Sequence, residues 1–283
     1  MTARPPAVRN DPPAMDPLLV ATAAEVVLHA GAIQRGRFGT DVGVGKKGEI
    51  NLVTEVDLDI ERWFRRLIAE RFPAHRVLAE EFDEGRDGAP VERPDCCWVF
   101  DPIDGTVNYA HGLPIFCASL ALEIDGAPVV GAVYDPMREE LFTAERGAGA
   151  RLNGAPLQVS QAPTLVDSML CTGFPYDVHE TVDEVVGLFG AFVAEAQAVR
   201  RLGSAALDLC YVAAGRFDGF WEQRLHPWDV AAGALIVTEA GGVVTGLHGE
   251  PFVSRDGSIV ASNGRVHEAM LATIRGRSLQ RTG

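Results

Sequence analysis

Apolar residues recur along this chain at two spacings, and each spacing predicts a different kind of secondary structure. A period near 3.6 predicts helices, at 17–35, 56–68, 182–199, 204–214 and 230–240. Short apolar runs between turn residues predict strands, at 50–54, 77–79, 96–100, three between 117 and 143, and then 217–221, 243–244 and 259–261. Both halves of the chain therefore mix helices and strands.

Turn residues organise the strands of the first half. They are Asp125-Gly126, Asp135-Pro136 and Asn153-Gly154. Hairpins at these points predict an antiparallel sheet. We find no internal repeat and no Pro- or Gly-rich linker, so the boundary between halves is soft. The expected organisation is a disordered tail at 1–15, an N-terminal half at 16–155, a C-terminal half at 156–275 and a flexible tail at 276–283.

Composition and charge narrow the class of protein. Of 283 residues, 47% are hydrophobic and 7% aromatic, which fits a soluble globular protein. A formal net charge of −14 argues against a nucleic-acid binder, and it means that a phosphorylated substrate would need divalent cations. Five cysteines without C-x-x-C spacing favour a reduced, cytoplasmic protein. Neither a signal peptide nor an apolar stretch of about 18 residues is found, so we expect no membrane span.

The segment DPIDGT at 101–106 is the strongest candidate for chemistry. It follows the apolar run 96–100, which predicts a buried strand, so Asp101 and Asp104 should lie at a strand end. Gly105 allows a ligand close to the backbone, and Thr106 can begin a helix with free N–H groups. Such a unit can hold both a cation and a phosphate. By itself it could equally be an Asp-capped turn.

Two further motifs accompany this segment: Glu80-Glu81 after a short strand, and WDVAAG at 228–233. The three motifs together resemble the inositol monophosphatase family, whose superfamily includes fructose-bisphosphatases and phosphoadenosine-phosphate phosphatases. The resemblance spans roughly residues 20 to 265, and three ordered motifs are more specific than one. It implies an α+β fold, a layered αβαβα sandwich with an antiparallel sheet in the N-terminal half and a mixed sheet in the C-terminal half. It also implies a homodimer.

The resemblance further implies a magnesium site. Glu80, Asp101 and the carbonyl of Ile103 would hold one Mg²⁺. Asp101, Asp104 and Asp229 would hold a second, so that Asp101 bridges the two ions. Glu80 would also help to hold a third, weaker ion. Oxygen ligands completed by water and substrate phosphate suit Mg²⁺, although Asp229 alone could be a simple helix-start carboxylate.

In the family scheme a metal-activated water attacks phosphorus in line with the leaving oxygen, without a covalent enzyme intermediate. Asp57 and Thr106 resemble the pair that orients and deprotonates this water, with Glu80 as a further catalytic residue. The amides of Gly105 and Thr106 would face the phosphate. Asp57 alone could equally be a helix-start residue, but its place after 51–54 favours the catalytic interpretation. The implied reaction converts inositol monophosphate to inositol and phosphate and is inhibited by lithium.

Other residues match family positions near the substrate. They are Lys46 on a mobile loop, Gly203 and Ala205 in one short run, Glu222, and the metal ligands Asp104 and Asp229. A carboxylate such as Glu222 suits a ring hydroxyl, because it accepts strong hydrogen bonds. Alternatives stay open: Lys46 could be a solvated neighbour of Lys47, Glu222 a surface residue at a strand end, and Ala205 a packing residue.

Three rival hypotheses remain. Haloacid-dehalogenase-like phosphatases carry Asp-x-Asp-Gly-Thr, but here two residues separate the aspartates. The same fold and mechanism could instead act on histidinol phosphate, fructose 1,6-bisphosphate or a nucleotide 3′-phosphate; Glu222 and the lack of a basic nucleotide pocket favour inositol phosphate. A regulatory or scaffold protein could retain the fold without turnover, although the presence of every metal ligand argues against a dead enzyme.

Overall fold

The computed structural model describes residues 15–47, 52–82 and 95–280. Its helices are α1 (Pro17–Arg37), α2 (Glu55–Arg71), α3 (Thr106–Ala110), α4 (Val178–Glu195), α5 (Ala205–Ala213), α6 (Pro227–Glu239) and α7 (His267–Gln280). Its strands are β1 (Val44–Lys46), β2 (Leu52–Thr54), β3 (Arg76–Ala79), β4 (Cys96–Asp104), β5 (Cys117–Ile124), β6 (Ala127–Asp135), β7 (Glu140–Glu145), β8 (Gly149–Leu152), β9 (Ala155–Pro156), β10 (Met169–Thr172), β11 (Ala198–Arg200), β12 (Gly219–Gln223), β13 (Val243–Thr245) and β14 (Ser258–Ser262). The tail expected at 1–15 lies outside the described residues except for Met15.

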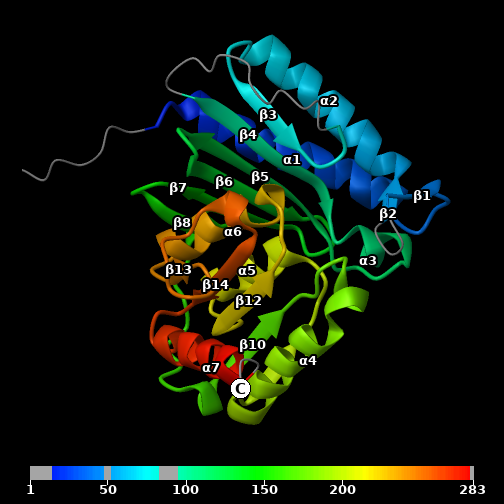
Figure 1. Ribbon diagram of the computed structural model, residues 1–283. Coiled ribbons are helices and arrows are strands. Elements are labelled where there is room, and N and C mark those ends of the chain that lie inside the picture. The colour runs from blue at the N-terminus through cyan, green and yellow to red at the C-terminus, as the bar shows by residue number, and fades with distance from the viewer. Residues whose placement is uncertain (1–14, 48–51, 83–94, 281–283) are drawn as a thin grey trace, which may run out of the picture.

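The elements stack in five layers: helix, sheet, helix, sheet and helix (Figure 1). α1 and α2 cover one face of a seven-stranded sheet with the order β3-β4-β5-β6-β7-β8-β9, and α5 and α6 lie against its other face. α5 and α6 separate this sheet from a second one, ordered β11-β10-β12-β14-β13, whose outer face is covered by α4 and α7. The predicted αβαβα sandwich is confirmed.

β4 shows how the apolar runs produce central strands. Its alternate side chains enter different clusters: Cys97 and Val99 pack toward α5 and α6, whereas Trp98 and Phe100 pack toward α1 and α2. A strand buried on both faces reads as a continuous apolar run, because successive side chains point to opposite sides. The run at 96–100 was apolar throughout for this reason.

Strand pairing agrees with the predicted hairpins. β5, β6 and β7 pair antiparallel across the turns at 125–126 and 135–136, although β3 pairs with β4 in parallel. In the second sheet β10 is parallel to β11 and β12, while β14 is antiparallel to β12 and β13. The second sheet is therefore mixed, as expected.

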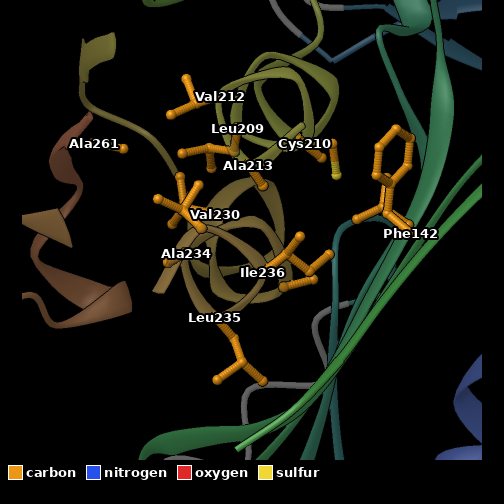
Figure 2. Packing of buried hydrophobic residues seen from close by; sticks show 14 of the residues in the cluster. Phe142, Leu209, Cys210, Val212, Ala213, Val230, Ala234, Leu235, Ile236 and Ala261 are labelled. Atoms are coloured by element: carbon orange, nitrogen blue, oxygen red, sulfur yellow. The ribbon is translucent and has the colours of Figure 1, made fainter. Parts of the chain in front are cut away.

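Small residues bring the middle helices close to each other and to the first sheet. In Figure 2, Phe142 of β7 lies next to Cys210 of α5, and Ala261 of β14 lies on the opposite side of the helices. A Cβ atom on Gly131 of β6 would stand 3.0 Å from a backbone oxygen of α6, and one on Gly233 of α6 would stand 2.6 Å from Leu209 of α5. α5 and α6 come from the C-terminal half but bury much of the first sheet.

The structure differs from the sequence prediction at several element ends. The helix predicted at 182–199 is α4, which ends at Glu195, and Val199 lies in β11 because it pairs beside Leu170 of β10. α7 was not predicted, since its buried apolar positions are few, and it continues to Gln280 through most of the segment expected to be a flexible tail. The predicted boundary in the 150s falls where the chain leaves the first sheet, after β9.

α1 is long and apolar enough, by length and composition alone, to cross a membrane. Only this helix meets that criterion within the described residues. Its Val26, Val27 and Ala30 are fully buried, and the helix contacts β5 and β6. A helix that packs on the core of a globular protein passes the same test, so the criterion is weak evidence for a membrane here.

Candidate active site

The end of β4 carries the two aspartates of the central motif. β4 pairs with β5 up to Asp101, and the register then shifts before Asp104 pairs with Cys117. Pro102 lies in this irregular stretch and has no N–H group to leave unpaired. The Ile103 amide donates to Asp101 Oδ1 over 2.9 Å. Both aspartates are buried, and both lie in the last four residues of β4.

Gly105 turns the chain from β4 into α3. Its φ of 97° lies in the left-handed region, and a Cβ atom there would stand 2.9 Å from the Ile115 carbonyl oxygen. The Thr106 hydroxyl donates to the Ile103 carbonyl at 2.8 Å and lies 3.4 Å from Asp57 Oδ1. The predicted Thr106–Asp57 pair is therefore brought together. The shorter bond goes to Ile103, because one hydroxyl hydrogen cannot serve both acceptors fully.

Asp57 reaches the site from the first turn of α2. Thr54 and Asp57 form a capping box, in which Asp57 Oδ2 accepts the Thr54 amide at 2.8 Å and also the Thr54 hydroxyl. Asp57 Oδ1 is the oxygen that faces Thr106. The helix-start interpretation of Asp57 is confirmed, and the same side chain also lies where a base acting with Thr106 would stand.

Glu80 and Glu81 follow β3 and face Lys47. The Lys47 ammonium lies 2.8 Å from Glu80 and 2.6 Å from Glu81. Lys46, which was predicted to approach the site, is exposed in β1, so its neighbour makes this contact instead. Adjacent residues along an extended chain point to opposite sides, and a difference of one position decides which lysine faces the carboxylates.

Asp104 links the two halves of the chain. Its Oδ2 accepts the Ser204 hydroxyl at 2.6 Å and the Ala206 amide at 2.7 Å. The Ala206 amide belongs to the first turn of α5, where helix N–H groups lack partners within the helix, so Asp104 caps α5 from another element. Ser204 was not identified from the sequence as a partner of Asp104.

Asp229 lies in the first turn of α6, as predicted. Its Oδ2 accepts the His226 amide at 2.7 Å, and Pro227 occupies the first helical position. The helix start therefore fixes this carboxylate, whose pKa is raised by burial and by the charge of nearby Asp104.

A cavity of about 240 Å³ opens beside these carboxylates. Its wall includes predicted residues from four separate segments: Asp104, Gly105, Thr106, Gly203, Ala205, Glu222 and Asp229. The fold therefore brings the predicted phosphate-binding and substrate-binding positions to one cavity of the size of a small ligand site.

The model of the inositol monophosphatase family matches residues 16–280. The chain belongs to the inositol monophosphatase family. It is 45% identical over 249 residues to an inositol-1-monophosphatase from Synechocystis, covering 88% of this chain and 85% of the relative. It is also 46% identical over 236 residues to the Nus factor SuhB of Escherichia coli K12, covering 83% and 86% of the two chains.

Solved structures of the family share the fold. An inositol monophosphatase from Anabaena superposes with a TM-score of 0.80 at 40% identity, covering 92% of this chain and 96% of the other. The suhB protein from Bartonella henselae gives a TM-score of 0.84 at 36% identity, covering 91% and 98%. Membership of this family supports a phosphatase function and dependence on metal ions.

The carboxylates of this inositol monophosphatase family member crowd together with little positive charge. Burial raises the pKa of Asp101 well above its ordinary value, and the charges of Glu80, Asp104, Asp229 and Asp57 raise it further. Burial is also the main reason why the pKa of Asp104 rises to about 6 and that of Asp57 to about 7. Such a cluster can carry its full negative charge only beside a cation.

A hard divalent cation fits this donor set. Asp101, Asp104 and Asp229 each place one carboxylate oxygen in a hydrogen bond to a backbone amide, which leaves the other oxygen for a ligand. Within the described residues, no three Asp, Glu, His or Cys side chains already converge on one ion position, and Lys47 provides the positive charge beside Glu80. Mg²⁺ retains several waters and needs few protein carboxylates, so it suits such a site.

Glu222 lies on the wall of the cavity and is not a surface residue. It is only 7% exposed, and burial raises its pKa to about 8 while Arg201 opposes the shift. Gly173 provides the space for its carboxylate, since a Cβ atom at this glycine would stand 2.1 Å from both Glu222 oxygens. No local pattern in the sequence marks Gly173, which lies 49 positions before Glu222.

Two arginines, which were not predicted at the site, also line the cavity. A comparison of substrates tests whether they form the basic nucleotide pocket that was expected to be lacking. Arg224 pairs with Asp177 at 2.7 Å and has a φ of 60°, which is unusual for a residue with a side chain. The Arg201 guanidinium lies 5.5 Å from the centre of the Phe174 ring. Both arginines come from loops outside the three motifs, so only the fold reveals their place.

Proposed function

We propose that this chain is a Mg²⁺-dependent phosphomonoesterase that hydrolyses inositol monophosphate to inositol and phosphate. The observation that carries the proposal is the group of carboxylates at one cavity, whose wall includes the buried Asp104 and Glu222 and the partly buried Asp229. The 45% identity to an inositol-1-monophosphatase supports the same activity. The cation would bind on one side of the cavity and the alcohol on the other.

Four carboxylates and one carbonyl are the proposed metal ligands. Glu80, Asp101 and the Ile103 carbonyl would hold one ion, and Asp101, Asp104 and Asp229 a second, with Glu80 contributing to a third, weaker ion. Bound Mg²⁺ would neutralise phosphate charge, lower the pKa of a water and shield the leaving oxygen. Lys47 would have to share or release Glu80 when this ion binds, because it now lies 2.8 Å from that carboxylate.

Asp57 and Thr106 would place the attacking water. Because the Thr106 hydroxyl donates to the Ile103 carbonyl, its oxygen remains able to accept a hydrogen from water. Asp57 Oδ1, 3.4 Å from the same hydroxyl, would accept the second proton as the water attacks. Burial raises the pKa of Asp57 to about 7 in the metal-free chain, and a cation bound nearby would lower this pKa, which favours the charged form that accepts the proton. In-line attack then needs no covalent intermediate.

The phosphate and the alcohol would bind to different walls. The amides of Gly105 and Thr106 precede the first hydrogen bond of α3, which runs from the Tyr109 amide to the Gly105 carbonyl, and they are the proposed donors to phosphate oxygens. Glu222 would accept hydrogen bonds from ring hydroxyls. Gly203 and Ala205 would allow the ring to approach α5.

A phosphate-release assay tests the proposal. Purified protein is incubated with inositol 1-phosphate, histidinol phosphate, fructose 1,6-bisphosphate and adenosine 3′,5′-bisphosphate, each with Mg²⁺ and with excess chelator. We expect the highest kcat/KM for inositol 1-phosphate and loss of turnover in chelator. Full activity in chelator would overturn the metal mechanism, whereas a higher kcat/KM for another ester would overturn only the substrate.

Arg201 and Arg224 favour one alternative substrate class. Guanidinium groups bind phosphate well, so a substrate with a second phosphate, such as fructose 1,6-bisphosphate, would find partners at the cavity wall. The Arg201→Gln variant distinguishes the two classes. If Arg201 binds a second phosphate of the substrate, this variant should lower kcat/KM for a bisphosphate much more than for inositol 1-phosphate.

A regulatory role without catalysis is the alternative from another class of function. It is favoured by the relatives named Nus factor SuhB, one of which is 46% identical to this chain. Such a role would not require turnover, so the Asp229→Asn variant should lose phosphatase activity and keep the regulatory one. We also propose a homodimer, which sedimentation velocity tests, and inhibition by lithium, which the same phosphate-release assay tests.

A further inference from the structure

Glu61 is a buried carboxylate that the proposed mechanism does not use. It lies in α2 with a fully buried side chain. Its oxygens accept the Glu81 amide at 2.7 Å, the Phe82 amide at 3.0 Å and Arg65 Nε at 2.7 Å. Arg65 also donates to the Phe82 carbonyl. A buried charge is tolerated when donors surround it, and here three donors do so.

The bonds of Glu61 and Arg65 hold the backbone directly after Glu80. They bind the backbone of Glu81 and Phe82, one and two positions after Glu80, where β3 has ended and strand pairing no longer fixes the chain. Glu61 and Arg65 therefore form a clamp on residues 81 and 82. The direction of Glu80 depends on where this backbone is held.

The same helix also carries Asp57. Asp57, Glu61 and Arg65 follow one another at intervals of four residues, so their side chains form one row along a face of α2. Asp57 faces Thr106 at one end of this row, and the clamp holds the segment after Glu80 further along. α2 thus connects the candidate base to the backbone that carries Glu80.

We propose that Glu61 and Arg65 are positioning residues, which fix Glu80 in the place where it can share a divalent cation with Asp101. This inference rests on the proposed metal site. The clamp touches neither the cation nor the substrate. It acts mainly on the ion that Glu80 holds. The ion at Asp104 and Asp229 should be affected much less, because those residues lie on other segments and Asp101 is the one proposed ligand that the two ions share.

Direct measurement of Mn²⁺ binding tests the clamp. Free Mn²⁺ is counted by its EPR signal during titration of the full chain and of the Glu61→Gln variant. Glutamine has one acceptor oxygen and a donor amide, so one of the Glu81 and Phe82 amides loses its acceptor. We expect about 10- to 100-fold weaker binding at one class of site, as for other groups that orient metal ligands, and a much smaller change at the remaining class, which shares only Asp101 with the first.

Matched controls separate positioning from folding. Asp59→Asn alters an exposed residue of the same helix that pairs with Arg62, and it should leave Mn²⁺ binding unchanged. A purely structural role of Glu61 would lower Tm and leave the affinity of the folded protein unchanged. If Glu61→Gln does not fold, Arg65→Lys keeps the charge, loses the fork that joins Glu61 to the Phe82 carbonyl, and should weaken the same class of site.

The outcomes distinguish this inference from the proposed function. Wild-type affinity in folded Glu61→Gln or Arg65→Lys protein would overturn the clamp alone. Failure of the wild-type chain to bind Mn²⁺ would overturn both. In a supporting result, excess Mg²⁺ also restores kcat in the variant, because a positioning defect weakens ion binding without removing a catalytic group.

Discussion

The two walls of the cavity are built differently. On the metal side, the wall residues Asp104 and Asp229 are joined by further carboxylates of β4, α2 and the end of β3, and burial and these charges raise the pKa of Asp101. Lys47 provides the positive charge beside Glu80. The alcohol side combines one buried carboxylate, Glu222, with Arg201 and Arg224 on separate loops. The first arrangement requires a cation, whereas the second can be adapted to different alcohols. The difference separates what the reaction needs from what selects the substrate.

Loss of a carboxylate on the metal side should have the largest effect. Asp104→Asn removes a proposed ligand but keeps an oxygen that can accept the Ala206 amide. We expect kcat to fall on the order of 10²–10³-fold, as when other groups that stabilise transition-state charge are removed. Circular dichroism should show the wild-type fold. A folded variant with less than a tenfold loss would contradict the assignment.

On the alcohol side, Glu222→Gln should have a smaller and substrate-dependent effect. A lost charged hydrogen bond to a ring hydroxyl corresponds to about 10- to 100-fold in kcat/KM for inositol 1-phosphate. Glycerol 2-phosphate has no ring, so its hydrolysis should change little. Equal losses for both substrates would show that Glu222 serves the metal side instead.

Gly173→Ala should act through Glu222. The added Cβ atom would meet both Glu222 oxygens at 2.1 Å, so the carboxylate must move. We expect KM for inositol 1-phosphate to rise several-fold, within the range expected for a weakened hydrogen bond, with kcat nearly unchanged. Gly190→Ala in α4 is the matched control, because a Cβ atom there meets nothing within 4 Å. An unchanged KM would mean that Glu222 relocates without loss of contact.

The smallest expected effect is a shift of thermal stability with pH. The folded protein raises the pKa of Asp57 to about 7 and of Glu222 to about 8, from ordinary values of 3.8 and 4.5. Folding therefore favours the protonated forms, and their stabilisation is full below about pH 4 and is lost as pH rises through 7 and 8. Metal-free protein should have a higher Tm at pH 5.5 than at pH 8.5.

Mg²⁺ should offset this loss on the metal side only. At a concentration 100 times Kd, a bound ion adds about 2.7 kcal/mol, or roughly 5–10 °C in Tm. The gain should be larger at pH 8.5 than at pH 5.5, because the carboxylates are then charged. Glu222→Gln should remove the alcohol-side share of the pH dependence. A gain that is larger at pH 5.5 would contradict this assignment.

The fold could be predicted where the sequence pattern is local. β4 was visible as an apolar run because both its faces are buried, and the turn at Asp125-Gly126 was visible because both residues adopt positive φ. α7 was missed because few of its positions are apolar and buried. Val199 was assigned to a helix because its pairing with β10 depends on a strand 29 positions away in the sequence.

The candidate site shows the same limit. The residues from Asp101 to Thr106 lie in one short segment, so the sequence could indicate their shared chemistry. Lys47, and not the predicted Lys46, contacts Glu80, and this depends on which side of an extended chain faces the carboxylate. Gly173 lies against the Glu222 carboxylate, and Arg201 lines the cavity, only through long-range packing, and no local pattern marks either residue. The helical period alone places Glu61, four positions after Asp57, on the same face of α2. Its contacts with the backbone of Glu81 and Phe82 could not be predicted, because they join separate segments of the chain.

The decisive experiment asks whether the carboxylates around Asp101 hold Mg²⁺ for hydrolysis of a phosphate ester. The rate of phosphate release from inositol 1-phosphate is measured at fixed protein concentration during a titration from excess chelator to excess Mg²⁺. We expect no turnover in chelator and a saturable rise with Mg²⁺ in the wild-type chain. We expect no comparable rise in Asp104→Asn. Turnover that is independent of Mg²⁺, or equal in the variant, would contradict this expectation.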